Sequence, residues 1–419
     1  MKKHTLFTIN HLLLFLLGSM LMLSACQDDE MAEGGAPMIE RVRFTDTTLA
    51  PADTSLGQAT LGSTIAIVGR NLASAQYVYL NDYEIPVNSA YATDRYLITT
   101  VVDSVPTVAT NPDVMNTLRV VNPYGEATYE FRTLPPAPIV DGVANQYVKA
   151  GETLTLYGRY FYFVDTVYLP GEVAVTEGIS ANGSTLSLTV PADYTPTDGT
   201  IQVSSQSGIS NPNRASQLYS GYGTVSNFDD TFPWGWGINA ETHVTTEATG
   251  IQPIENKFAL VDMSLPGNYG WSNDKVINLV DWGGAQIYPT APAAIYDPTL
   301  SIESFDARME VAVSSSASLE GVELQVYYQD QNNTELTTNV PLTDFIRSQD
   351  GRWYTVSVPL SDLENSGTRL STYGDILTGN ANSEHHFRIV IINTTADDVP
   401  VTMAIDNVRV VNAEAEIEE

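Results

Sequence analysis

The sequence predicts an all-β protein with several domains: two small β-sandwiches followed by a larger sandwich. Apolar and polar residues alternate with a period of two, with Gly and Asn-Pro turns between the runs, which is typical of antiparallel strands. The segment Gly62–Arg70 returns in similar form at Gly151–Arg159, which indicates a structural repeat. From about Gly221 the composition changes, and all five tryptophans lie after that point.

The N-terminus predicts an exported protein. Lys2 and Lys3 precede an apolar run (residues 12–23), and small residues follow, so residues 1–25 are expected to be a secretory signal peptide. The run is short for a membrane span. Cys26 is the sole cysteine, so it cannot form an internal disulfide. The segment resembles a bacterial lipobox, which implies that Cys26 carries a lipid. A signal without lipidation is the alternative.

Residues 26–35 are expected to be a flexible acidic linker. Gln27–Glu30 resembles the lipoprotein export signal of Bacteroidota, which implies a lipid-anchored protein on the outer membrane, facing the cell exterior. A solvated linker without such a signal would have the same composition.

The charge balance limits the classes of ligand. The chain has 50 acidic against 19 basic residues and a net charge of −31. Such a charge repels nucleic acid and other polyanions, so we expect no nucleic-acid partner and favour a neutral glycan over a charged one. With no disulfides available, the chain must be stabilised by ordinary hydrophobic cores, and its length is sufficient for several domains.

Residues 36–134 and 135–218 are predicted to be two similar sandwiches of immunoglobulin-like size. Each has a Gly-x-Thr segment with alternating aliphatic residues that ends in Gly, and each ends in a strand after an Asn- or Ser-rich turn. This pattern resembles the IPT/TIG family. The first copy departs from it by an insertion around residues 45–60. The proline-rich Leu134–Pro138 predicts an extended, stiff connection between the copies. We expect the pair to act as a spacer, with partner binding as the alternative.

Residues 219–413 are predicted to form a larger two-sheet sandwich of the jelly-roll type, since strands such as Val322–Tyr328 alternate apolar with polar residues. Asn227–Asp230, Arg352–Leu363 and Ile405–Arg409 resemble segments of jelly-roll carbohydrate-binding modules. The order of parts along the chain resembles the surface glycan-binding proteins of Sus-like uptake systems. This resemblance implies binding of a neutral polysaccharide or oligosaccharide. It also implies a TonB-dependent transporter and its glycan-binding lipoprotein as partners.

The candidate glycan site is a group of aromatic residues in loop-like stretches. Four tryptophans lie within residues 234–282 beside Gly, Asn and Asp, which favour tight turns that expose a ring. An exposed indole suits the apolar face of a sugar, and nearby amides suit its hydroxyls. Burial of these rings in a core is the alternative. The predicted site residues are Trp271, Trp236, Trp282, Tyr269, Trp234 and Asn273. Trp353 precedes an alternating strand and is expected in the core.

No arrangement of residues in the sequence predicts catalysis, so we expect a binding protein and not an enzyme. A glycoside hydrolase is the weaker alternative, because sequence cannot place two carboxylates at a fixed separation. An adhesin or scaffold that binds protein is the other alternative, since clustered aromatic residues also suit protein interfaces. We expect no required cofactor. Related modules hold calcium near positions such as Asp229 and Asp406, so a structural Ca²⁺ there is a hypothesis.

Overall fold

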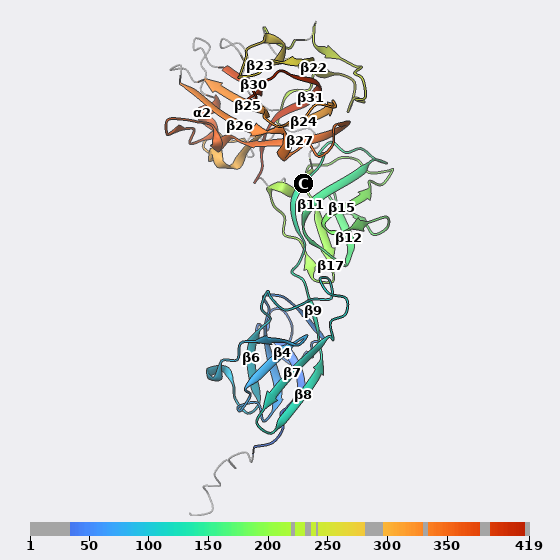
Figure 1. Cartoon of the computed structure of the whole chain (residues 1–419), viewed down its shortest axis with the longest axis vertical. Helices are drawn as coiled ribbons and strands as arrows, with labels where there is room; N and C mark the ends of the chain where they lie inside the picture. The colour runs from blue at the N-terminus through green and yellow to red at the C-terminus, as the bar shows by residue number, and fades with distance from the viewer. Residues whose placement is uncertain are drawn as a thin grey trace, which may run out of the picture. The chain divides into compact units, whose positions relative to one another are not determined.

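The structure is a computed structural model that describes residues 34–218, 223–230, 236–239, 242–280, 296–329, 334–377 and 386–414. The chain divides into two compact units, one ending at Pro136 and the other starting at Ala137 (Figure 1). The elements named below are nearly all strands, so the predicted all-β class is confirmed. Within these described ranges, no helix is long and apolar enough to cross a membrane.

The first unit is a small β-sandwich. Its described strands form the sheets β1-β3-β6 and β5-β4-β7-β8, and a parallel pair β2-β9 joins the predicted insertion to the end of the unit. Buried side chains such as Ile67, Leu80 and Phe131 fill the space between the sheets. The strands are β1 (Met38–Phe44), β2 (Gln58–Thr60), β3 (Thr64–Arg70), β4 (Tyr77–Leu80), β5 (Tyr83–Ile85), β6 (Tyr96–Thr100), β7 (Thr117–Asn122), β8 (Gly125–Glu130) and β9 (Arg132–Leu134).

The second unit begins with a sandwich of the same plan. Its described strands form the sheets β10-β11-β15-β14 and β13-β12-β17-β18, with a short pair β16-β19. The strands are β10 (Ile139–Val143), β11 (Thr153–Phe161), β12 (Val164–Leu169), β13 (Val173–Val175), β14 (Ser180–Ala181), β15 (Gly183–Thr189), β16 (Gly199–Thr200), β17 (Gln202–Ser205), β18 (Gly208–Ile209) and β19 (Gln217–Leu218).

The repeated glycines have the same structural role in both sandwiches. Gly69 on β3 is opposite Ile39 on β1, and Gly158 on β11 is opposite Val140 on β10. A methyl group on Gly69 would lie 1.8 Å from the carbonyl oxygen of Met38, and one on Gly158 would lie 2.1 Å from that of Ile139. The recurring Gly therefore permits a close approach of the first strand.

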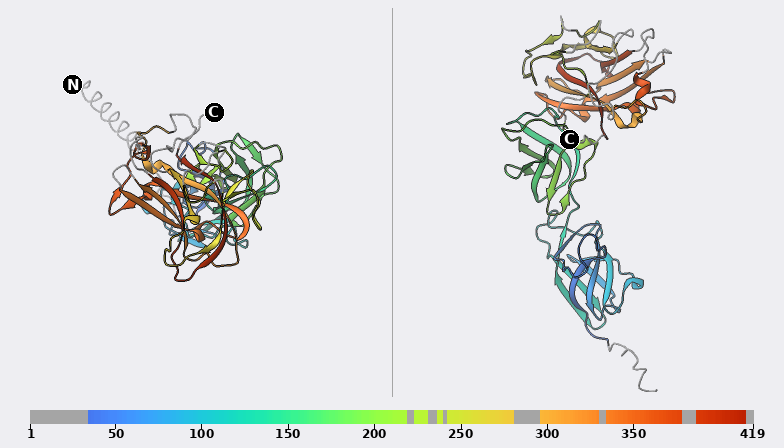
Figure 2. Two further views of the ribbon diagram at one scale, coloured as in Figure 1. Left: turned by 90° about the horizontal axis from the view of Figure 1, so that it is seen from above. Right: turned by 180° about the vertical axis from the view of Figure 1, so that it is seen from behind.

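The rest of the second unit is a larger sandwich of two six-stranded sheets, counted over the described residues. One sheet has the order β21-β22-β31-β24-β27, with β20 paired to β31, and the other has the order β23-β30-β25-β26-β28-β29. Figures 1 and 2 show this sandwich from three sides. Its core contains buried side chains from both sheets, including Phe305, Tyr328 and Phe387.

The strands of this sandwich are β20 (Thr224–Ser226), β21 (Val244–Thr245), β22 (Phe258–Leu265), β23 (Val276–Val280), β24 (Phe305–Ser314), β25 (Val322–Gln329), β26 (Glu335–Pro341), β27 (Asp350–Pro359), β28 (Glu364–Asn365), β29 (Thr368–Arg369), β30 (His386–Asn393) and β31 (Val399–Asn412). The described α-helix is the five-residue α2 (Tyr373–Leu377). Short 3-10 turns are η1 (Ser89–Tyr91), η2 (Arg214–Ser216), η3 (Asn273–Lys275), η4 (Ile302–Ser304), η5 (Leu342–Asp344) and η6 (Leu360–Asp362).

Candidate functional site

The candidate site lies on the outer face of the sheet β23-β30-β25-β26. Successive side chains of β25 alternate between buried and half-buried, so Tyr328 points into the core while Tyr327 points outward. The strand register places Arg388 of β30 beside Tyr327, and Asn278 of β23 beside Arg388. In the neighbouring row, Gln325 donates a hydrogen bond to Asn339 Oδ1 at 3.0 Å. The outer face therefore combines polar and aromatic side chains.

Two tryptophans lie together over one end of this face. The Trp236 ring packs on the outward side chains of Val276, Val390 and Ile392, and is therefore half-buried. The Trp271 ring lies 6.0 Å from it, centroid to centroid, at 54°. Trp271 is 61% exposed, which is unusual for a residue that is mostly buried in proteins. Trp236, which is itself packed on the sheet, therefore supports the exposed ring of Trp271.

The loop that carries Trp271 is held to the sheet by backbone hydrogen bonds. Asn268 and Tyr269 have positive φ angles of 54° and 58°, which turn the chain sharply. The Asn268 N–H donates to Thr395 O at 2.7 Å, and the Tyr269 N–H donates to Asn393 O at 3.0 Å. These contacts fix the loop on the turn between β30 and β31.

Side chains of the same loop complete its support. The Trp271 Nε1–H donates to Asn273 Oδ1 at 3.0 Å, which fixes the plane of the indole. Lys275 is buried beneath the loop and donates from Nζ to Gly270 O at 2.6 Å. Burial lowers the pKa of the Lys275 ammonium. The exposed ring of Trp271 is therefore preorganised.

Arg388 connects the tryptophans to Tyr327. Its guanidinium carbon lies 5.0 Å from the Trp236 ring centroid and 5.3 Å from that of Tyr327, both within cation–π range. The Arg388 Nε–H donates to Asn278 Oδ1 at 3.1 Å. We call Trp236, Trp271, Arg388 and Tyr327 the aromatic platform.

The Tyr327 hydroxyl is held at the other end of the platform. It donates to Glu335 Oε1 at 2.9 Å and lies 3.1 Å from Gln329 Oε1. Burial and the Glu335 carboxylate raise its pKa, so the phenol is neutral at physiological pH.

Sequence reasoning missed Tyr327 and Arg388. The pair Tyr327-Tyr328 was the available signal, since neighbouring residues of a strand point to opposite faces.

Of the predicted site residues, the structure brings Trp271, Trp236 and Asn273 together. Tyr269 lies in the same loop and is 61% exposed. Trp234, Trp282 and the predicted lipidation site Cys26 lie outside the described residues, so their roles stay predictions.

Trp353, predicted to be a core residue, is half-buried in a small apolar cluster on the other sheet. Its ring contacts Phe258 edge-on at 5.8 Å, and its Nε1–H donates to Gln252 O at 2.6 Å. The cluster also contains Ile251, Ala312 and Ala404. Trp353 is thus a packed ring outside the aromatic platform.

The predicted calcium residues lie on the same side of the domain. Asp406 of β31 is 1% exposed, and Asp229 accepts a hydrogen bond from the Lys257 N–H at 2.9 Å. Burial, with the neighbouring carboxylates of Glu310 and Asp229, raises the pKa of Asp406 to about 8. Within the described ranges, no group of three or more His, Cys, Asp or Glu side chains is arranged to hold a metal ion. The calcium site stays a prediction.

Residues 218–412 match the family described as "Surface glycan-binding protein B xyloglucan binding domain". This match confirms the resemblance to surface glycan-binding proteins. The aromatic platform lies inside the matched residues.

Two further proteins are similar to this chain. An "IPT/TIG domain-containing protein" of Bacteroides ovatus is 32% identical over 170 residues, which are 39% of this chain and 34% of that protein. The chain thus spans about a third of the length of this curated relative. The crystal structure of surface glycan-binding protein PbSGBP-B from Prevotella bryantii covers 91% of this chain and 99% of its own, with 20% identity and a TM-score of 0.61. That structural similarity supports the all-β, multidomain fold.

Proposed function

We propose that this protein binds a neutral glycan chain without catalysis, on the aromatic platform of its C-terminal sandwich. The observation that carries the proposal is the exposed Trp271 ring supported by Trp236 at 6.0 Å on the outer face of a sheet. An isolated exposed tryptophan would be unremarkable, but this ring is fixed by its loop, by Asn273 and by a second indole. Such preorganisation lowers the entropy cost of binding.

The chemistry of the platform suits a polyhydroxylated ligand. The ring faces offer apolar surface to the C–H faces of sugars, as aromatic rings do for other flat ligands. Gln325 and Asn339 place amide groups on the same sheet face, where they can donate to and accept from hydroxyls. The strongly negative chain disfavours an anionic glycan.

For the ligand class we propose a β-glucan backbone, with xyloglucan as the first member to test. The support is the description of the family that residues 218–412 match. A site on an exposed sheet face can contact the interior of a long chain, whereas an enclosed pocket would accept a chain end. Xyloglucan and mixed-linkage glucan therefore belong in the same binding experiment.

We propose that the protein has no catalytic role. The four residues of the aromatic platform are three aromatic rings and an arginine, and the neighbouring carboxylate of Glu335 accepts a hydrogen bond from the Tyr327 hydroxyl. Glycoside hydrolysis needs a pair of carboxyl groups on either side of the scissile bond. Incubation of the protein with xyloglucan should therefore release no reducing ends, and any such release would contradict this part of the proposal.

For location we propose a lipid anchor at Cys26 on the outer membrane, with the glycan domain facing outward. The support is the lipobox-like segment and the acidic residues after it. Cys26→Ala should release the protein from the membrane fraction or block its maturation. A variant that fractionates with membranes like the wild type would contradict the anchor.

We further propose a TonB-dependent transporter and its glycan-binding lipoprotein as partners.

The experiment that tests the binding proposal is affinity electrophoresis of the protein in gels containing one polysaccharide each. We expect retardation by xyloglucan or mixed-linkage β-glucan, none by anionic polygalacturonate, and relief by the matching free oligosaccharide. Binding that survives protease treatment of the ligand excludes the alternative of a protein-binding adhesin. Failure of every neutral polysaccharide to retard the protein would contradict the proposal.

A further inference from the structure

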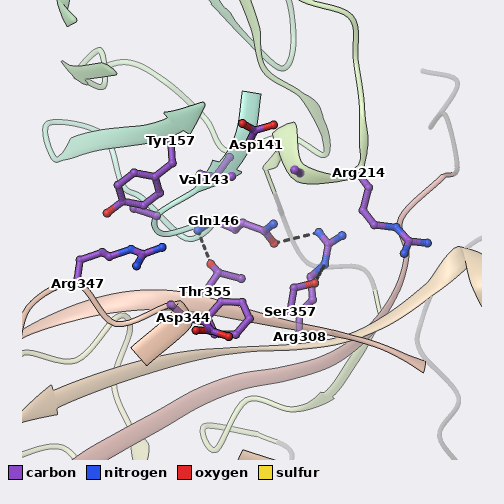
Figure 3. Close-up of a pocket in the computed structure, with 14 residues that line it drawn as sticks. Asp141, Val143, Gln146, Tyr157, Arg214, Arg308, Asp344, Arg347, Thr355 and Ser357 are labelled. Carbon is purple, nitrogen blue, oxygen red and sulfur yellow. Dashed lines mark hydrogen bonds between the residues drawn. The ribbon is translucent and has the colours of Figure 1, made fainter. Parts of the chain in front are cut away.

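A second candidate site lies where the first sandwich of the second unit meets the C-terminal sandwich. A cavity of about 350 Å³ separates β10 and β11 of the one from β27 of the other (Figure 3). The two sides are joined beside it, because the Thr355 N–H donates to Ala144 O at 2.8 Å. The lining residues belong to the same compact unit, and none belongs to the aromatic platform.

The floor of this cavity is polar and fixed by buried hydrogen bonds. Gln146 accepts at Oε1 from Arg308 Nη1 at 3.3 Å, and its backbone N–H donates to Thr355 Oγ1 at 2.8 Å (Figure 3). Arg308 is 1% exposed and donates from Nε to Ser357 Oγ at 3.1 Å. The floor thus presents amide, hydroxyl and guanidinium groups whose positions are set by the fold.

The walls of the cavity are apolar. They are formed by Val143, Ala144 and Phe345, with the half-buried ring of Tyr157 on one side. The guanidinium carbon of Arg347 lies 5.6 Å from the centroid of the Tyr157 ring, near the outer limit of a cation–π contact. Figure 3 shows Tyr157 and Arg347 on the same side of the cavity. An aromatic wall above a polar floor suits a ligand with one apolar and one hydroxylated face.

The charges around the cavity balance, which favours an uncharged ligand. The lining contains Arg214, Arg308 and Arg347, and the matching carboxylates are Asp141 and Asp344 in the lining and Asp306 behind it. Asp306 lies 2.7 Å from Arg308 Nη2 and 3.3 Å from Arg214 Nη1. At the exposed rim, Arg347 is accompanied by Asp344, its neighbour on the turn that follows β26. An anion would meet Asp141 and Asp344, and a cation would meet the arginines. A neutral, polyhydroxylated molecule meets neither penalty.

We propose that this junction pocket binds a neutral saccharide of one or two sugar units. Ligand pockets usually measure roughly 300–1,000 Å³, so this one is suited to a small saccharide and not to a polymer chain. The Tyr157 ring covers the C–H face of the sugar. The Thr355 and Ser357 hydroxyls, which already donate to Glu310 and Asp306, accept from its hydroxyls. The pocket is a second carbohydrate site, separate from the aromatic platform. It holds a short side branch or a free oligosaccharide end.

The test uses the full chain with the platform disabled by Trp271→Ala and Arg388→Met. Saturation-transfer NMR is recorded with d-glucose, d-xylose, d-galactose and cellobiose. We expect a saturable signal from at least one of these sugars, and a loss of affinity of at least tenfold when Tyr157→Ala is added. Tyr168→Ala is the matched control, since Tyr168 is an exposed tyrosine of the same sandwich that does not line the pocket.

Arg347→Met is a second pocket variant at an exposed position, in case Tyr157→Ala does not fold. Absence of a signal from all four sugars, or a signal that neither pocket variant changes, would overturn the proposal. Binding of inorganic phosphate in place of a sugar would also overturn it. This outcome does not depend on the aromatic platform. If the wild-type chain binds no polysaccharide but gives a sugar signal that depends on Tyr157, the proposed function is contradicted and the junction-pocket proposal is not.

Discussion

At the scale of single residues, Arg388 organises the aromatic platform. Its side chain lies between the Trp236 and Tyr327 rings, so its removal loosens both rings without opening the core. Arg388→Met keeps the aliphatic length and loses the cation. We expect about a tenfold loss of glycan affinity, equivalent to about 1.4 kcal/mol, with little change in melting temperature. Isothermal titration measures the affinity.

Arg369→Met is the matched control for this variant, because Arg369 is an exposed arginine of the same sheet that pairs with Glu364. It should bind like the wild type. Equal affinities for Arg388→Met and the wild type would show that the arginine has no part in the platform.

Asp406 predicts a pH dependence of stability. Its folded pKa of about 8 lies above the unfolded value of about 3.9. Between these values the unfolded chain releases the proton while the folded carboxyl keeps it, so stability falls as pH rises. Relative to Asp406→Asn, the wild type should lose up to about 1.4 kcal/mol per pH unit from pH 5 to 8. Urea unfolding in chelator measures this.

The same series tests the calcium hypothesis. Bound calcium favours the ionised carboxylate, so added calcium should raise the stability of the wild type above pH 6 and flatten its slope. Asp406→Asn should respond less. Parallel slopes for the wild type and Asp406→Asn in chelator would contradict the raised pKa, and an unchanged melt on adding calcium would remove the metal site.

Sequence reasoning at this scale predicted Trp271, Trp236 and Asn273 as site residues and missed Tyr327 and Arg388. Trp271 is predictable because Asn268, Gly270 and Asn273 surround it with turn chemistry. Tyr327 and Arg388 lie in ordinary alternating strands. Which strand face is covered, and which residue is adjacent across the register, depends on pairing between segments far apart in the chain.

At the scale of elements, the repeat is the feature that sequence predicts best. The glycines at positions 69 and 158 recur because each faces a strand that approaches too closely for any side chain. The strand order is also shared: β5-β4-β7-β8 in one sandwich corresponds to β13-β12-β17-β18 in the other. The pairing of β2 with β9 was not predictable, since a three-residue parallel contact leaves no periodic signal.

Gly69→Ala tests the close approach of β1 to β3. The added methyl would overlap the Met38 carbonyl, so the strands must separate, at a cost of about 1–3 kcal/mol. Thermal unfolding should show an earlier transition for the first unit, with glycan binding unchanged. Gly57→Ala is the control, since no atom lies within 4 Å of the position of its methyl group. Equal melting of the two variants would contradict the packing argument.

At the scale of the whole molecule, the net charge of −31 and the position of the aromatic platform on an exposed sheet face both favour a neutral glycan as the ligand. Sequence composition alone indicated a neutral partner, whereas the buried junction around Gln146 could not be predicted. That junction brings Gln146 to Arg308 and Arg409, which are more than 100 residues away in the chain. Arg308 and Arg409 are buried, so their guanidinium groups need hydrogen-bond acceptors in place of water. Gln146, in the loop between β10 and β11, accepts a hydrogen bond from each of them.

The most direct test of the account compares Trp271→Ala with Trp353→Ala in xyloglucan binding and in thermal stability. Removal of the exposed Trp271 ring should weaken binding at least tenfold, within the roughly 1–3 kcal/mol of an aromatic stacking contact, and should leave the melting temperature almost unchanged. Removal of Trp353, which packs on Phe258, should lower stability by about 3 kcal/mol and spare binding. Added salt should have little effect on either affinity. Undiminished xyloglucan binding by Trp271→Ala would contradict the central claim that the glycan binds on the aromatic platform through this ring.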